Sequence, residues 1–234
     1  MIVIRNLRRE LNGKKITRTL LFLIIAFMGI VNYANAQIEG TCGDNLKWKL
    51  AKKDNNVTLT ISGCGDMYNY YFNEPWIHYQ SSINSVDIDN GVTSIGDEAF
   101  YYCKSLTSIT IPNSVISIGN RAFDGCESLT SIKIPNSVTK IGNMAFAYCK
   151  SLTSITIPNS ITEIGEAVFK SCKSLTSITI PNSITSIGES AFAYCGGLTS
   201  IKIPNSVTSI GKWAFAGCSS LTSINVATNN PNYS

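Results

Sequence analysis

Cysteine is the residue type in this 234-residue chain that combines the most regular spacing with the widest choice of chemistry. Six of the eight cysteines recur every 23 residues, at Cys103, Cys126, Cys149, Cys172, Cys195 and Cys218. Thiols can pair as disulfides, bind a metal ion or act as nucleophiles. The single histidine, His78, lies outside the series, which disfavours a zinc site with imidazole ligands.

The surroundings of these six cysteines favour a role in the core. Each comes three residues after a phenylalanine, as Cys126 follows Phe123. Side chains stacked in parallel point the same way, which is poor geometry for a disulfide, and a buried free thiol behaves as a small hydrophobe. We therefore predict an inert structural ladder, with a disulfide or a metal site as the less favoured alternatives.

The sequence offers few other combinations of reactive groups. Acidic side chains occur singly, and the many serines arise from a repeated Thr-Ser pair. Hydrolysis would need convergent carboxylates, or a nucleophile with its base. We therefore predict no catalytic residue, no metal ligand and no cofactor, and a protein that is not an enzyme.

The elements that must hold these residues are copies of one 23-residue unit. In the copy that begins at Leu106, the alternation of Leu106, Ile109 and Ile111 predicts a short strand with these side chains inward. Pro112 ends the strand because it has no N–H group to donate. The unit restarts at Leu129, Leu152, Leu175, Leu198 and Leu221, and a weaker copy opens at Ile83.

The rest of the unit predicts a second strand and a turn. Val115 and Ile118 return to the core on another extended stretch, and Gly119 follows where a positive φ is expected. Ala122 and Phe123 then share one side of a helical turn with the cysteine. A period of this length is typical of stacked leucine-rich coils. The predicted fold is a repeat solenoid of about seven coils, mainly β, with short helical or 3-10 turns.

Outward-facing positions of the solenoid are the candidates for ligand binding. Thr110, between two inward residues, must point to solvent. The ligand-face candidates of this column are Asp87, Thr110, Lys133, Thr156, Thr179, Lys202 and Asn225. The turn-face candidates are Tyr102, Tyr148, Tyr194 and Trp213, because exposed aromatic side chains favour interfaces. A solvated surface without a ligand is the alternative for both sets.

Residues 37–82 break the repeat and predict an N-terminal β cap, which stacked repeats need at their ends. Two alternating stretches separated by a turn at 54–56 predict a hairpin. Pairing Leu50 with Val57 would bring Cys42 close to Cys64, so we predict a disulfide there, with two free thiols as the alternative. The aromatic residues that follow either cover the first coil or form a carbohydrate-stacking platform; they are Tyr68, Tyr70, Tyr71, Phe72, Trp76 and Tyr79.

Residues 1–36 predict a signal peptide that is removed from the mature chain. A basic region precedes the apolar stretch Leu20–Val31, and Ala34-Asn35-Ala36 forms a small-residue cleavage site. The stretch is too short to span a bilayer, so the expected membrane contact is through this peptide alone. The leader holds six of the 19 basic and one of the 15 acidic residues, which leaves 13 and 14. This balance disfavours nucleic-acid binding.

The unit L-x-x-I-x-I-P-N-S-V-x-x-I-G-x-x-A-F-x-x-C-x-S closely resembles the BspA-like leucine-rich repeat, also called the Treponema-type repeat. The resemblance covers residues 83–226, and the stretch from Gly40 to Trp48 resembles the module that precedes such arrays. It implies a protein secreted by, or on the surface of, a host-associated bacterium. The implied partners are protein ligands, either host matrix proteins or the surface proteins of other bacteria, and no catalytic residue is implied.

The chain departs from the usual repeat at three places. Ser114 and its equivalents stand where better-known leucine-rich repeats carry a buried asparagine, so no typical asparagine ladder is expected. Val168 replaces the alanine of the other coils, and its extra methyl groups are expected to shift the backbone slightly. Residues 227–234 look like the start of an incomplete or irregular C-terminal coil. Its open edge is a candidate for self-association, which gives a structural surface scaffold as the alternative function.

Overall fold

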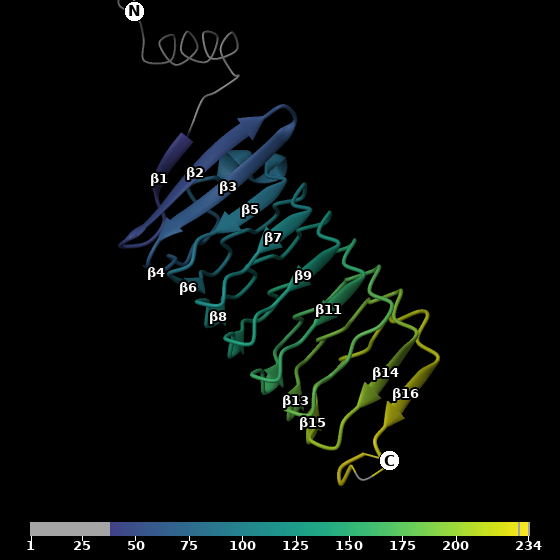
Figure 1. Cartoon of the computed structure of the whole chain (residues 1–234). Coiled ribbons are helices and arrows are strands. Elements are labelled where there is room, and N and C mark those ends of the chain that lie inside the picture. The colour runs from purple at the N-terminus through teal and green to yellow at the C-terminus, as the bar shows by residue number, and fades with distance from the viewer. Residues whose placement is uncertain (1–37, 229, 234) are drawn as a thin grey trace, which may run out of the picture. The chain divides into compact units, whose positions relative to one another are not determined.

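The structure is a computed structural model that describes residues 38–228 and 230–233. The predicted signal peptide, residues 1–36, lies outside the described residues. From β1 onward the chain forms a small β cap and then a stack of 23-residue coils (Figure 1). The predicted solenoid of about seven coils, mainly β and with almost no helix, is confirmed.

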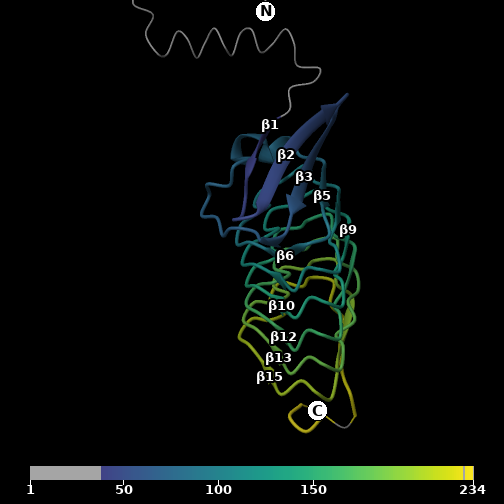
Figure 2. The ribbon, with the colours of Figure 1, turned by 60° about the vertical axis from the view of Figure 1, so that its left-hand side comes forward.

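Each coil has two extended sides, because it contains two stretches of inward-pointing aliphatic residues. The first side consists of β1 (Ile38–Thr41), β2 (Leu46–Lys53), β3 (Asn56–Gly63), β5 (Ser85–Ile88), β7 (Ser108–Thr110), β9 (Ser131–Lys133), β11 (Ser154–Thr156), β14 (Ser200–Ile203) and β16 (Ser223–Val226). The second side consists of β4 (Gly65–Asp66), β6 (Val92–Ile95), β8 (Ser117–Ile118), β10 (Lys140–Ile141), β12 (Glu163–Ile164), β13 (Ser186–Ile187) and β15 (Ser209–Ile210). Paired strands of neighbouring coils are parallel, with equivalent residues opposite each other. Figure 2 shows the coils stacked one after another.

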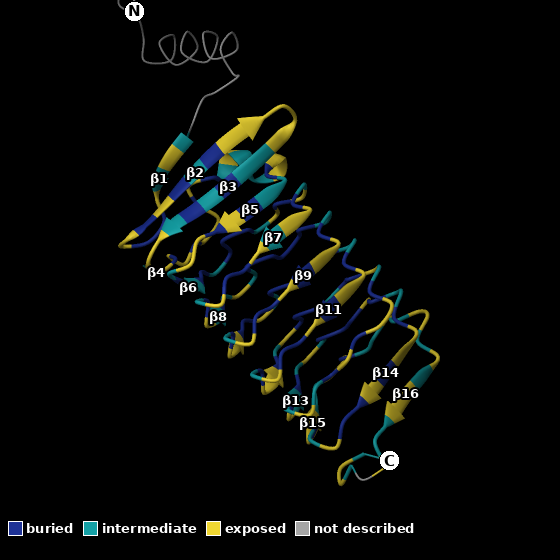
Figure 3. Cartoon of the chain, in the orientation of Figure 1, coloured by how far each residue is buried: buried dark blue, intermediate teal, exposed yellow. Residues whose placement is uncertain are grey.

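The core runs through the middle of the stack, and Figure 3 shows buried residues, in dark blue, recurring from coil to coil along the chain. Its central feature is a column of stacked phenylalanine rings with centroids 5.3 to 5.9 Å apart. The column comprises Phe100, Phe123, Phe146, Phe169, Phe192 and Phe215. The widest step, 5.9 Å, lies between Phe146 and Phe169, beside the buried Val168. A wider spacing there is consistent with the extra volume of valine.

The third side is a turn and contains no regular helix in the coils that the structure describes. We call residues 97–102 and their equivalents in later coils the turn segment. Two positions of this segment have positive φ in every coil, for example Arg121 (51°) and Tyr148 (55°). Alternate backbone N–H groups here donate to carbonyl groups of the next coil, as Phe100 does to Ala122, and those between them donate to the third residue back, as Tyr101 does to Glu98.

The expected positive φ at Gly119 is wrong, because Gly119 is absent from the residues with such angles. The glycine is needed for a different reason. A Cβ atom at this position would lie 2.5 Å from the backbone nitrogen of Asp97 in the preceding coil. Close approach of neighbouring backbones therefore requires glycine here.

The predicted cap hairpin forms from β2 and β3, but its register differs from the expected one. Leu50 pairs with Leu59 rather than with Val57, because the strands continue to the pair Lys53 and Asn56 and the turn between them consists of two residues, of which Asp54 has a positive φ of 55°. β3 also pairs in parallel with β5, so the stacking of coils already begins within the cap. One 3-10 helix, η1 (Ile77–Ser82), completes the cap.

Ser114 and its equivalents stand where other leucine-rich repeats carry a buried asparagine, and some of these serines bond to the preceding coil. Hydroxyl groups of Ser137 and Ser160 donate to the carbonyl groups of Val115 and Val138 in the preceding coil, the first at 2.7 Å. These bonds connect neighbouring coils through a shorter side chain than asparagine.

Candidate ligand-binding faces

The structure brings the seven ligand-face candidates together in one exposed column on the first side. Direct cross-strand partners are Asp87 with Thr110, Lys133 with Thr156, and Lys202 with Asn225. A single bridge joins Thr156 to Thr179. All seven side chains are exposed. In the central coils, Lys133, Thr156, Thr179 and Lys202 each lie between two buried isoleucines.

The column is hollowed at the coil of Thr179, where regular strand pairing is interrupted. Three ligand-face candidates, Thr156, Thr179 and Lys202, line this hollow. The other polar and apolar side chains that line it are Asn159, Asn182, Ile155, Ile157, Ile180, Pro181 and Pro204. The hollow therefore combines hydroxyl groups, side-chain amides and one ammonium group with apolar proline rings.

Threonine hydroxyl groups on the first side fall into two groups. Four of those that follow the leucine of a unit are used within the solenoid, as Thr153 donates to Thr130 at 3.2 Å and Thr222 donates to Thr199 at 3.1 Å. Thr110, Thr156 and Thr179 form no side-chain hydrogen bond with other described residues. Their hydroxyl groups are therefore available to a ligand.

The cap extends the same column, which the sequence reasoning missed. Thr60 of β3 lies opposite Asp87, Lys49 lies opposite Thr60, and Glu39 lies opposite Lys49. The sequence feature that could have shown this is the alternation of polar and apolar residues from Thr58 to Ile61, which matches the first strand of a coil. The prediction treated the cap as separate from the repeat and so did not include these residues in the column.

The turn-face candidates occupy two columns of the turn segment. Tyr102, Tyr148 and Tyr194 share the second positive-φ position of the turn segment, whereas Trp213 occupies the first. Tyr194 and Trp213 are 56% and 66% exposed, and Tyr148 is half-buried. Tyr194, Trp213 and Met144 line a groove whose other residues are Glu166, Ala167, Lys170, Glu189, Ser190, Ala193 and Ala216.

Two of the three tyrosine rings lie against a glycine in the next coil. A Cβ atom at Gly125 would lie 2.8 Å from the Tyr102 ring, and one at Gly217 would lie 2.6 Å from the Tyr194 ring. Ser171 holds the matching position after Tyr148 and has a positive φ of 61°. Large and small residues therefore alternate from coil to coil along this column.

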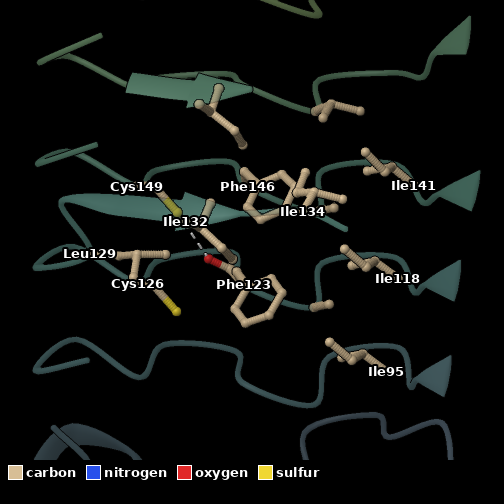
Figure 4. Close-up of a cluster of buried hydrophobic side chains, with 14 of the residues drawn as sticks. Ile95, Ile118, Phe123, Cys126, Leu129, Ile132, Ile134, Ile141, Phe146 and Cys149 are labelled. Carbon is tan, nitrogen blue, oxygen red and sulfur yellow. Dashed lines mark hydrogen bonds between the residues drawn. The ribbon is translucent and has the colours of Figure 1, made fainter. Parts of the chain in front are cut away.

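The 23-residue cysteine ladder is buried, with Cys218 of the last coil only partly so. Each thiol from Cys126 onward donates to the carbonyl oxygen of a phenylalanine in the preceding coil, and Figure 4 shows the bond from Cys149 to Phe123, 3.2 Å long. Burial raises the pKa of these thiols, for Cys195 to about 12. The thiolate needed for nucleophilic or metal chemistry is therefore suppressed.

The predicted pairing of Cys42 and Cys64 rested on the hairpin register that the structure corrects. Cys64 follows β3 and donates its backbone N–H to Asn45, while Cys42 precedes β2. Both are free thiols, Cys42 buried and Cys64 exposed. The two side chains thus lie in different environments, and no disulfide joins them in this structure.

The predicted aromatic cluster of the cap divides between core and surface. Trp76 and Tyr70 are buried, and Trp76 stacks on Phe100 at 6.1 Å. Tyr71 and Phe72 are 74% and 53% exposed. The buried pair covers the first coil.

Carboxyl groups are buried where the cap meets the array. Burial, aided by Glu98, raises the pKa of Glu74 from 4.5 to about 7. Burial likewise raises the pKa of Asp124 to about 6. Glu98 accepts a hydrogen bond from the Phe72 N–H at 3.0 Å and lies 3.9 Å from the Arg121 guanidinium. Among the described residues, no group of three or more potential ligands is arranged to hold a metal ion.

The repeat and its register decide the family. A model of the BspA type leucine rich repeat region matches in six copies, over residues 74–196 and 139–233. The chain belongs to this family. BspA-type solenoids are a non-enzymatic scaffold type used for protein–protein interaction. A comparison with curated proteins gave no match.

Solved structures of bacterial leucine-rich repeat proteins are similar to this BspA-type chain. A leucine rich cell surface protein from Faecalibacterium prausnitzii is 33% identical with a TM-score of 0.65, over 81% of this chain and 54% of that one. The leucine rich repeat protein of T. pallidum is 25% identical with a TM-score of 0.61, over 74% and 87% of the two chains. The pneumococcal vaccine antigen PcpA shares the fold, with 22% identity and a TM-score of 0.52, over 84% and 51%. This chain spans about half the length of the F. prausnitzii protein.

The described part of the chain contains no helix with the length and apolar character of a membrane span.

Proposed function

We propose that the chain is an exported, bacterial cell-surface protein that binds protein ligands, and that it mediates adhesion to host matrix proteins or to other cells. Family membership and the cell-surface relative from F. prausnitzii support this proposal. The observation that carries it is the column of seven exposed side chains on the first side. Its three central members surround the hollow at Thr179.

The hollow suits a protein ligand better than a small molecule because it is an open part of a long surface. Apolar contact with Pro181 and Pro204 would add to polar contact with Thr156, Thr179 and Lys202. Interfaces commonly combine an apolar centre with polar groups at its rim. Lys133, the neighbour of Thr156 across the strands, extends the positive charge of the column.

A binding panel of matrix proteins, mucins and glycans tests the proposal. We expect saturable binding to at least one protein of the panel, reduced roughly tenfold when Lys133→Glu and Lys202→Glu are combined. The matched control combines Lys140→Glu with Lys173→Glu, which makes the same charge change away from the column and should leave binding unchanged. No binding to any member of the panel would contradict adhesion by this chain.

The alternative is a structural scaffold that associates with itself through the last coil. Analytical ultracentrifugation distinguishes the two functions. A monomer at all concentrations, together with saturable ligand binding, supports the adhesin. Association that grows with concentration, without a ligand in the panel, supports the scaffold.

A further inference from the structure

A groove on the turn side of the solenoid is lined by side chains that change from coil to coil. Met144, Tyr194 and Trp213 line it, together with seven smaller or charged residues, and we call it the turn groove. Its residues come from four successive turn segments, which are 143–148, 166–171, 189–194 and 212–217. None of its residues belongs to the ligand column on the first side. The turn groove is therefore a separate candidate site.

Two small residues separate the two ends of the turn groove. Met144, Ala167, Ser190 and Trp213 hold the same position in the four segments, with φ between 52° and 57°. Ala167 is buried and Ser190 is half-buried, so the space between the two large side chains stays open. Neighbouring parallel strands lie about 4.8 Å apart, so the three steps from Met144 to Trp213 span roughly 14 Å. This length exceeds the width of a single sugar or amino-acid ring.

Backbone groups of the turn groove are already used within the solenoid. The N–H groups of Ala167 and Ser190 donate to the carbonyl groups of Glu189 and Lys212, each at 2.9 Å. An extended peptide that binds by strand addition needs free backbone groups. A ligand of the turn groove is therefore recognised through side chains.

The charged side chains at the turn groove balance one another. Glu166 and Glu189 share one column, Lys212 continues that column one coil later, and Lys170 also lines the groove. Two carboxylates and two ammonium groups give a net charge of zero. None of the four forms an ion pair with another described residue. This balance disfavours a strongly acidic or basic ligand and leaves both hydrogen-bond acceptors and donors free.

Tyr194 supplies an aromatic ring within the array, and Trp213 supplies a second one. Tyr194 remains 56% exposed although the next coil places Gly217 against its ring. The faces of aromatic rings carry partial negative charge and attract weakly positive C–H groups. A sugar ring presents such C–H groups on its face and hydroxyl groups at its edge. Hydroxyl groups both donate and accept hydrogen bonds, as the mixed charges of the groove require.

We propose that the turn groove binds an uncharged oligosaccharide. One sugar ring stacks on Trp213, and hydroxyl groups of the same chain donate to Glu166 and Glu189 and accept from Lys170. A cationic peptide, which would place an ammonium group on the indole, is the competing class of ligand. The proposal is independent of protein binding by the column on the first side, because the two sites share no residue.

The test titrates the full chain with four neutral hexasaccharides, cellohexaose, xylohexaose, mannohexaose and chitohexaose, and separately with hexalysine. Tryptophan fluorescence reports on the groove, because Trp48 and Trp76 are buried and Trp213 lines the site. We expect a saturable blue shift of the emission with at least one hexasaccharide, and weaker binding of hexalysine.

Two variants change the apolar part of the groove. Ser190→Met fills the space between the two ends, and Met144 at the equivalent position shows that the backbone accepts this side chain. Trp213→Ala removes the stacking ring. Calorimetric titration is expected to show roughly tenfold weaker oligosaccharide binding for each variant.

A third variant changes the acceptors. Glu166→Gln combined with Glu189→Gln keeps the shape of the side chains and should weaken binding roughly threefold to tenfold, since hydrogen bonds to carboxylates are stronger than those to amides. Glu163→Gln is the matched control, because this exposed glutamate belongs to the coil of Glu166 but lies on β12, outside the groove. The control should bind as the wild type does.

Three results would overturn the proposal. The first is no binding of any of the four hexasaccharides at millimolar concentration. The second is binding that neither Ser190→Met nor Trp213→Ala weakens. The third is tighter binding of hexalysine than of every hexasaccharide, lost in Ser190→Met, which would assign the groove to cationic peptides.

Discussion

At the N-terminal end of the array, Trp76 lies on Phe100 with its indole N–H bonded to Ala99. In the last described turn segment, Phe215 has no ring beyond it, and the N–H groups of Trp213, Phe215 and Gly217 have no acceptor among the described residues. The coils between these ends have nearly the same sequence. The two ends therefore differ because of residues that do not repeat, and a repetitive core does not define its own boundaries.

Removing the capping ring should have the largest effect on stability. Trp76→Ala deletes a fully buried indole and the donor to Ala99, so we expect the free energy of unfolding to fall by about 3–5 kcal/mol. Trp213→Ala, in the last described turn segment, should change it by less than about 0.5 kcal/mol, since this side chain is mostly exposed. Urea unfolding of both variants measures the difference, and equal losses would contradict the contrast between the ends.

The capped end should also make stability depend on pH. Because burial raises the pKa of Glu74 from 4.5 to about 7, the folded state favours its protonated form. The stabilisation of the folded state that comes from keeping this carboxyl group protonated is complete below pH 4.5 and is lost as the pH rises through 7. It amounts to at most about 3 kcal/mol.

Glu74→Gln keeps the group neutral and should flatten this part of the profile. The variant is expected to be more stable than the wild type at pH 8 and similar to it at pH 4.5. Thermal unfolding across this range is the measurement. Parallel profiles for the two proteins would show that Glu74 is not the titrating group.

The smallest predicted effect compares equivalent glycines near the two ends. Gly125→Ser places a Cβ atom against the Tyr102 ring and should cost about 1 kcal/mol. Gly217→Ser meets the Tyr194 ring, but Gly217 belongs to the last described turn segment, whose N–H group at this position has no acceptor among the described residues, so its cost should be lower. Chemical unfolding of the pair checks the order, and a larger loss at Gly217 would contradict it.

The fold of the interior coils could be predicted because the same 23-residue pattern specifies the strands and the core of each coil. Alternation at Leu106, Ile109 and Ile111 gives the strand, and the same alternation places Thr110 outside. The regular cysteines gave the register, and the spacing after phenylalanine indicated burial. The family model and the solved structures confirm that fold.

Features that depend on contact between coils were not predictable from one unit. Arg121 and Tyr148 have positive φ, which residues of these types do not usually adopt. Hydrogen bonds from their N–H groups to the next coil favour this conformation. The hollow beside Thr179 arises where strand pairing is interrupted, although the sequence of that coil matches its neighbours. The predicted register of the cap hairpin was wrong, because the composition of a short turn does not determine how many residues it contains.

The alternation of tyrosine with glycine or serine restricts how an array of this kind can change in length. Tyr102, Tyr148 and Tyr194 are two coils apart, and each is followed one coil later by a small residue. Loss of a single interior coil would place one tyrosine against the next, or two small residues together. Loss or gain of two coils would preserve every such contact, so the unit of inheritance is expected to be 46 residues rather than 23.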